Sequence, residues 1–278
     1  MTTVIASHLP LSGMFISSWR GWLVLLLIGS GIGHEEYLTQ LHDSWRGGIM
    51  EEKTAQISSA ERITYRGATY DTYTVSLKEQ EVRLFWQGKD GLPYKNLRTL
   101  KVSLESEGKS LLFGMNAGMY KKDRSPQGLY IEDGQTRVSL DTGDANGNFY
   151  LKPNGVFLIR EDRAEVVETS QFSASPDILY ATQSGPLLLH NGKIHQAFRE
   201  GSKNLHIRNG VGIISPDKMV FVISNEVVNL YDFASLFKEH FGCEDALYLD
   251  GAISKMYAPD LNRSDLGGNL GPLIGVIR

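Results

Sequence analysis

Residues 229–254, NLYDFASLFKEHFGCEDALYLDGAIS, carry the signals of a helix, a strand and a polar turn in immediate succession. Asn229 is a suitable N-cap and Gly242 supplies a C-terminal stop, so we predict a helix over residues 230–241. Four large apolar side chains give this helix one apolar face: Phe233, Leu236, Phe237 and Phe241. The apolar run at residues 246–249 follows closely and predicts a buried strand.

Upstream of this stretch, the chain is a series of short strand-like segments separated by tight turns. The segments are residues 62–65, 70–77, 82–86, 111–115, 128–132, 155–159, 187–189, 210–214 and 219–223. Four turn pairs, which are strong hairpin signals, divide them: Asp133-Gly134, Asn146-Gly147, Asn154-Gly155 and Asn191-Gly192. Residues 94–104 are more helical in character, and a last strand is predicted at residues 273–277. We therefore predict an α+β fold, a β-rich single domain with mixed sheets and a few packed helices.

The first 33 residues differ from the rest of the chain. Arg20 is their only formally charged residue, and it precedes the apolar run 21–28 and a group of small residues. This order is typical of a secretory signal, although an uncleaved anchor or a buried core helix would also fit. We expect a signal or anchor at residues 1–33, a polar lead-in at 34–59 and the folded domain at 60–278. The predicted location is the periplasm or the extracellular space.

The net charge of the whole chain is −4, which argues against a general affinity for nucleic acid. Contact with a membrane is expected only through an uncleaved N-terminal segment, if at all. Residues 141–147 (DTGDANG) resemble a calcium-binding loop, but the alternation of acidic residues is broken and no Glu closes the loop at the right distance. The three histidines His190, His195 and His206 match no standard metal-ligand spacing. We therefore predict no metal and no cofactor.

Four short segments each join an apolar strand to glycines and polar side chains. They are residues 116–120 (NAGMY), 183–186 (QSGP), 208–212 (RNGVG) and 250–254 (DGAIS). Glycine allows a close approach of the backbone to a ligand. The planar guanidinium of Arg208 suits a phosphate, and Asp250 stands at a strand end as a candidate catalytic carboxylate. Taken singly, each segment is more often an ordinary turn.

We predict that Asp250, Arg208 and Asn116 are catalytic. The same segments supply the predicted substrate-binding residues: Gly118, Gln183, Ser184, Gly185, Asn209, Gly210, Gly251 and Ser254. A second catalytic carboxylate stays unassigned, with Glu132, Asp232 and Glu226 as candidates.

The four segments, together with residues 128–134 (GLYIEDG), resemble in their order the phosphodiester glycosidase family. The resemblance runs from about residue 82 to the C-terminus. It implies hydrolysis of a sugar 1-phosphodiester of the N-acetylglucosamine type, which releases the sugar and leaves a phosphomonoester. Asn116, Arg208 and Asp250 match polar positions of the family's motifs. Five glycines match the glycine positions: Gly118, Gly185, Gly210, Gly212 and Gly251.

The last motif departs from the family pattern, because Ala252, Ile253 and Lys255 interrupt its usual glycine and serine run. Two alternatives therefore stay open beside a glycosidase. One is a non-catalytic envelope protein that binds glycans or assists exopolysaccharide assembly, and the other is a phosphodiesterase on the same scaffold. The expected partner is a sugar phosphodiester or a phosphorylated glycan.

Overall fold

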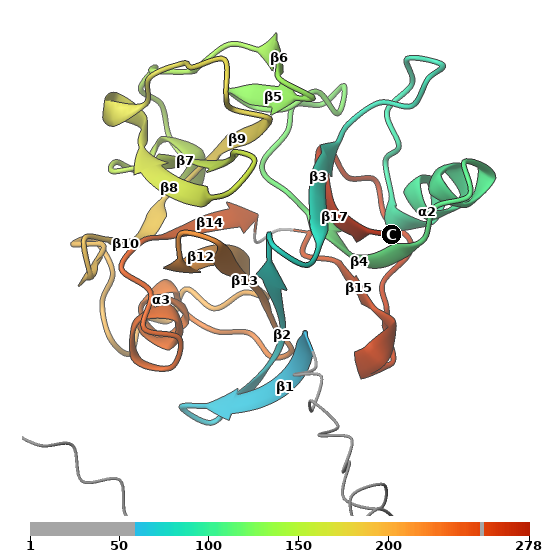
Figure 1. Ribbon diagram of the computed structural model, residues 1–278. Helices are drawn as coiled ribbons and strands as arrows, with labels where there is room; N and C mark the ends of the chain where they lie inside the picture. Colours follow the sequence, from blue (N-terminus) through green and yellow to red (C-terminus); the bar gives the residue numbers. More distant parts are fainter. Residues whose placement is uncertain (1–58, 251–252) are drawn as a thin grey trace, which may run out of the picture. The chain divides into compact units, whose positions relative to one another are not determined.

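The computed structural model describes residues 59–250 and 253–278, which form three β-sheets and two α-helices. Figure 1 shows the three sheets around a common centre, with a helix on the outer side of two of them. The α+β, β-rich prediction is confirmed. Every pairing between the described strands is antiparallel, which replaces the mixed sheets that we expected. The reason is that hairpins and returning loops bring neighbouring strands together in opposite directions.

The largest sheet has seven strands and carries one of the helices. In spatial order its strands are β1 (Ala60–Tyr65), β2 (Ala68–Ser76), β13 (Lys218–Ser224), β12 (Asn209–Ser215), β14 (Ala246–Asp250), β10 (Leu187–His190) and β11 (Lys193–Ile194). Helix α3 (Leu230–Glu239) begins where predicted, because Asn229 Oδ1 accepts the Asp232 N–H at 2.8 Å. The helix ends two residues before the predicted Phe241 and buries its apolar face.

The other two sheets have five strands each. The first contains β16 (Arg263–Ser264), β15 (Met256–Ala258), β4 (Leu111–Asn116), β17 (Leu273–Ile277) and β3 (Glu81–Phe85). The second contains β6 (Gln135–Val138), β5 (Tyr130–Glu132), β9 (Tyr180–Ser184), β7 (Gly155–Ile159) and β8 (Ala164–Glu168). Short 3₁₀ turns lie at η1 (Asn148–Tyr150), η2 (Thr169–Gln171) and η3 (Pro259–Leu261).

Helix α2 (Leu97–Ser106) packs against the sheet that contains β4 and starts later than the predicted residue 94. Asn96 sets this start, because its Oδ1 accepts the Thr99 N–H at 2.9 Å. Asp133-Gly134 and Asn191-Gly192 form the predicted hairpin turns, with positive φ at both residues of each pair. Asn154-Gly155 is no hairpin turn, since Gly155 is the first residue of β7 and the Asn154 side chain donates to the Phe149 carbonyl at 2.7 Å.

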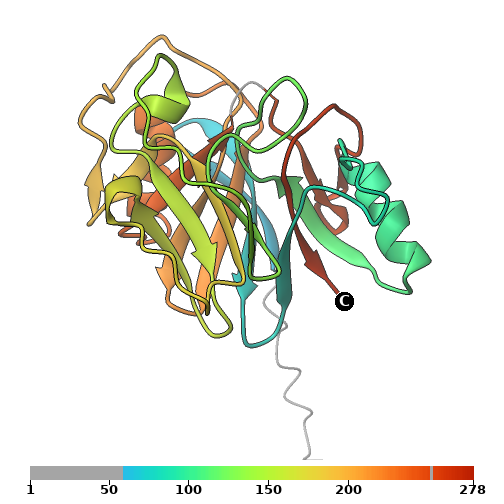
Figure 2. The ribbon, with the colours of Figure 1, turned by 90° about the horizontal axis from the view of Figure 1, so that it is seen from above.

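One hydrophobic core joins the three sheets. Phe113 of β4, Phe157 of β7 and Phe221 of β13 meet there, with ring centroids 5.3 Å apart for Phe113–Phe221 and 6.0 Å for Phe157–Phe221. Figure 2, turned by 90°, shows the sheet of β3, β4 and β17 beside the other two sheets, which overlap in this view. Because each sheet contributes to this core, the strand ends that carry the predicted polar segments have fixed positions relative to one another.

Candidate active site

The ends of four strands, drawn from all three sheets, bring the predicted polar segments together. Asn209 at the start of β12 pairs with Asp250 at the end of β14. The Asn209 Nδ2 donates to the Asn116 carbonyl at the end of β4, at 3.1 Å. The Ser184 Oγ at the end of β9 donates to the Leu249 carbonyl at 2.8 Å. The structure therefore places segments far apart in the sequence at one location.

Asn209 is the centre of this network and is fully buried. Its Oδ1 accepts the Asp250 N–H at 2.9 Å, and the Ser254 hydroxyl lies 3.5 Å from the same oxygen. The Ser254 hydroxyl also donates to the Asp250 carbonyl at 2.8 Å. These bonds fix the backbone on both sides of residues 251–252. Gly251, a predicted binding residue, lies outside the described residues.

Asn116 holds the other side of the network. Its Oδ1 accepts the Lys255 N–H at 2.9 Å, while its Nδ2 is buried and has no hydrogen-bond partner among the residues that the structure describes. An unsatisfied buried donor costs about 1–3 kcal/mol. A water molecule or a ligand oxygen is therefore the expected partner of this amide.

The Asp250 side chain is 8% exposed and acts electrostatically on two phenols. Burial, together with the Asp250 charge, raises the pKa of Tyr248 to about 12, against an opposing effect of Arg208. Burial and the same carboxylate also raise the pKa of Tyr120. The carboxylate of Asp250 thus lies near Tyr248 of β14 and near Tyr120 of the loop after β4.

Arg208 lies directly before β12 and is almost entirely buried. Its Nε donates to the Val228 carbonyl at 2.8 Å, its Nη1 to the Tyr248 hydroxyl at 3.2 Å and its Nη2 to the Asn204 carbonyl at 2.9 Å. These bonds occupy most of the N–H groups of Arg208, so few of them are available to donate to a ligand. Arg208 therefore acts mainly through its fixed positive charge. Arg208 and Asp250 both adjoin Tyr248, which the sequence analysis missed. The alternation of side chains along β14, which puts Tyr248 and Asp250 on one side of an ordinary strand, was the available signal.

The predicted glycines serve close packing at this location. A Cβ on Gly118 would lie 2.9 Å from Thr182 Oγ1, and one on Gly185 would lie 2.6 Å from the Phe149 carbonyl. A Cβ on Gly210 would lie 2.8 Å from the Leu247 carbonyl. Each space is filled by protein, so these glycines allow close packing against β9, the η1 turn and β14 respectively. Their contact with a substrate stays a prediction.

Gln183 has a structural role in the described residues. Its Oε1 accepts the N–H groups of Leu129 and Asp141, each at 2.9 Å, and its Nε2 donates to the Asp141 carbonyl at 2.6 Å. The side chain therefore connects β9 to the loop after β6. Binding of substrate by Gln183 also stays a prediction.

The three candidates for a second carboxylate already have partners or lie elsewhere. Glu226 accepts the Thr69 N–H at 2.6 Å, and Asp232 pairs with Arg66 at 3.2 Å. Glu132 lies at the far end of β5, opposite Tyr180 and away from Ser184 along β9. None of the three joins the hydrogen-bond network around Asn209.

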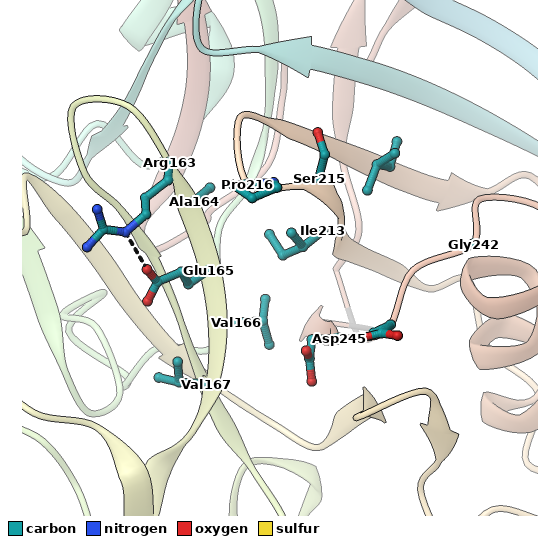
Figure 3. A pocket seen from close by; sticks show the side chains of 12 residues that line it. Arg163, Ala164, Glu165, Val166, Val167, Ile213, Ser215, Pro216, Gly242 and Asp245 are labelled. Carbon is teal, nitrogen blue, oxygen red and sulfur yellow. Dashed lines mark hydrogen bonds and ion pairs between the residues drawn. The ribbon is translucent and has the colours of Figure 1, made fainter. Parts of the chain in front are cut away.

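A pocket of about 550 Å³ lies away from this network, beside β8, the β12–β13 turn and the loop before β14. Figure 3 shows the ion pair of Arg163 and Glu165 on one side of it and Asp245 on another. None of the predicted site residues lines this pocket. The size of a pocket does not by itself indicate a catalytic function, so we place the candidate active site at the strand ends.

Among the described residues, no group of three or more His, Cys, Asp or Glu side chains could hold a metal ion. In the same part of the chain, neither helix is long and apolar enough to span a bilayer.

The sequence profile of the phosphodiester glycosidase family matches residues 109–276. The chain therefore belongs to the phosphodiester glycosidase family, and the resemblance noted from the polar segments is confirmed. Uncharacterized protein YigE of Escherichia coli (strain K12) is 39% identical over 189 residues, which cover 68% of this chain and 74% of the relative.

Two solved structures share the fold at low sequence identity. One is the zebrafish N-acetylglucosamine-1-phosphodiester alpha-N-acetylglucosaminidase catalytic domain, auto-inhibited by its pro-peptide. It has a TM-score of 0.54 and 15% identity, over 78% of this chain and 81% of that chain. The other is a putative exported protein from Burkholderia pseudomallei K96243, with a TM-score of 0.51 and 11% identity, over 75% of this chain and 74% of that chain.

Proposed function

We propose that this protein is an exported hydrolase that cleaves the glycosidic bond of a sugar 1-phosphodiester, with an N-acetylglucosamine-type sugar as the first candidate. Family membership supports the class of reaction. The observation that carries the proposal is the network in which Asn116, Asn209 and Ser254 surround the backbone of Asp250. The composition of residues 1–33 supports export.

In this reaction, water adds to the anomeric carbon of the sugar. The bond between that carbon and the phosphate oxygen breaks, so the free sugar and a phosphomonoester leave. A phosphomonoester is a good leaving group, and strong general-acid help is less necessary than in ordinary glycoside hydrolysis. The site must then stabilise a cationic sugar and a phosphate.

Asp250 suits the first task, as nucleophile, as base for the water or as an electrostatic partner of the sugar cation. The fixed charge of Arg208 suits the second, because it favours negative charge in its neighbourhood. The Asn116 Nδ2, which lacks a partner among the described residues, is a donor for a substrate oxygen.

The test is release of N-acetylglucosamine from UDP-N-acetylglucosamine or an alkyl phosphodiester of the sugar by the full chain. We expect Asp250→Asn to lower turnover by about 100-fold or more, because the group acting at the anomeric carbon loses its charge. Asp162→Asn is the matched control, since that side chain is 79% exposed in the β7–β8 turn. Equal activity of the two variants would remove Asp250 from the mechanism.

Hydrolysis in ¹⁸O-labelled water separates this reaction from that of a phosphodiesterase. Label in the released sugar means cleavage at the anomeric carbon, and label in the phosphate means attack at phosphorus. Folded wild-type protein that turns over no sugar phosphodiester would instead favour the non-catalytic, glycan-binding alternative.

A further inference from the structure

A small pocket of about 170 Å³ lies at the N-terminal end of α3, and we call it the α3 pocket. Three segments separated in the sequence form its wall: the η1 turn at Asn148, the loop from Ala197 to Arg208, and the first helical residues Leu230 and Tyr231. Arg208 connects the α3 pocket to the candidate active site through Tyr248.

The charge of Arg208 is not balanced by a neighbouring acid. Its side chain is 1% exposed, and no carboxylate forms an ion pair with it within residues 59–250 and 253–278. Its partners are two carbonyl oxygens, one amide oxygen and one phenol. Burial lowers the pKa of Arg208, against an opposing effect of Tyr248. An anion bound at the pocket would offset the free energy cost of burying the positive charge of Arg208.

The acids closest to the pocket in the sequence are held by another arginine. Arg66 pairs with Asp232 at 3.2 Å and with Glu200 at 3.3 Å. Asp232 also accepts the Asn229 side-chain amide at 2.6 Å. Both carboxylates are therefore engaged with other groups, and neither pairs with Arg208.

Two further features favour an anion at the same place. Arg199 lines the pocket and donates to the backbone carbonyls of Gln196 and Phe198, the latter at 3.0 Å. Its charge also has no acidic partner among the described residues. The pocket includes the first two residues of α3, where the positive end of the helix dipole lies. The buried arginine, the second arginine and the helix end converge on one small volume.

We propose that the α3 pocket binds the phosphoryl group of the substrate, and retains it in the phosphomonoester product. This proposal rests on the function proposed above. A tetrahedral phosphoryl group presents oxygens in several directions and suits donors that come from different elements. Asp250 follows Tyr248 by two residues, roughly 7 Å along β14. A phosphoryl group beside Arg208 therefore leaves its sugar within reach of Asp250.

The experiment measures binding of inorganic phosphate to the full chain by calorimetry, with sodium chloride at equal ionic strength as the reference. We expect phosphate to bind where chloride does not, and Arg199→Gln to weaken binding by about tenfold, since a charge-assisted contact is lost. Arg163→Gln, at the separate pocket beside β8, should leave phosphate binding unchanged. Arg199 is exposed, so its substitution avoids the loss of folding that a change at Arg208 risks.

Three results of the binding experiment would overturn the assignment. They are the absence of phosphate binding beyond that of chloride, an equal effect of Arg199→Gln and Arg163→Gln, or tighter binding of glucuronate than of phosphate. The last would make the pocket a carboxylate site. If the protein binds phosphate but hydrolyses no sugar phosphodiester, the phosphate site at the α3 pocket stands and the proposed hydrolase activity is wrong. If Arg199→Gln turns over a sugar phosphodiester with an unchanged KM, the proposed hydrolase activity stands and the phosphate site at the α3 pocket is wrong.

Discussion

Tyr248 shows how a single buried side chain relates the two charged residues of the candidate site. It accepts a hydrogen bond from Arg208, and its ring centroid lies 5.5 Å from the Arg208 Cζ. The negative charge of Asp250, two residues further along β14, helps to raise the pKa of Tyr248. Tyr248 therefore contacts Arg208 directly and lies close to the Asp250 carboxylate.

Glu132 gives a prediction at the same scale. Burial raises its pKa to about 7 from 4.5, so folding favours the protonated carboxyl. Its stabilising contribution is complete below about pH 4.5 and is lost as the pH rises through 7. We expect Glu132→Gln to raise the free energy of unfolding at pH 8 by about 1–2 kcal/mol and to leave it unchanged at pH 4.5.

Urea unfolding of Glu132→Gln at the two pH values checks this expectation. Glu161→Gln, an exposed position in the β7–β8 turn, is the control. An equal change at both pH values would mean that packing, and not ionisation, causes the effect.

The limits of sequence analysis at this scale follow from particular side chains. The polar and glycine character of the segments at Asn116, Arg208 and Asp250 could be seen in the sequence. The partner of each side chain could not, because it depends on strands that meet only in the folded domain. Gln183 illustrates this, since its amide bonds to the loop at Asp141, 42 residues away.

At the scale of elements, the contact between α3 and the seven-stranded sheet depends on a glycine of β12. A Cβ on Gly212 would lie 2.5 Å from Phe237 Cδ1 and 2.8 Å from Cys243 Sγ. Gly212→Ala would therefore push the helix from the sheet, and we expect a loss of about 1–3 kcal/mol in the free energy of unfolding. Chemical denaturation measures it.

Gly267→Ala is the matched control, because no atom lies within 4 Å of a Cβ added there. A loss in Gly212→Ala no larger than in Gly267→Ala would show that α3 adjusts without cost.

The elements themselves were predictable to different degrees. Strand β17 and the start of α3 agree with the predicted bounds, because each has a clear apolar pattern and clear ends. Strand β9 was not predicted, since its last three residues, Thr182, Gln183 and Ser184, are polar yet buried. Their hydrogen bonds replace the apolar contacts by which a buried strand is recognised.

At the scale of the whole molecule, the family match begins at residue 109, but the sheets begin earlier. Strand β2 pairs with β13, and β3 pairs with β17. Asp71 of β2 is buried and accepts Arg62 Nε at 2.6 Å and Arg263 Nη1 at 2.9 Å, which joins two sheets. Residues 59–108 thus belong to the same folded domain as the matched residues.

We expect a chain of residues 59–278 to unfold in one cooperative transition, because it contains every described strand. A chain of residues 109–278 should show no such transition, since β13 and β17 lose a partner strand and the core loses Tyr73 and Leu84. Thermal unfolding followed by circular dichroism compares the two. Cooperative unfolding of the shorter chain would show that the first three strands are dispensable.

The position of β17 has a consequence for biosynthesis. The strand is the last that the structure describes, yet it lies inside its sheet, between β4 and β3. The ribosome must therefore have synthesised β17 before β3 can pair with it and the common core can close. Folding of this domain is therefore completed only after synthesis has passed Ile277, the last residue of β17.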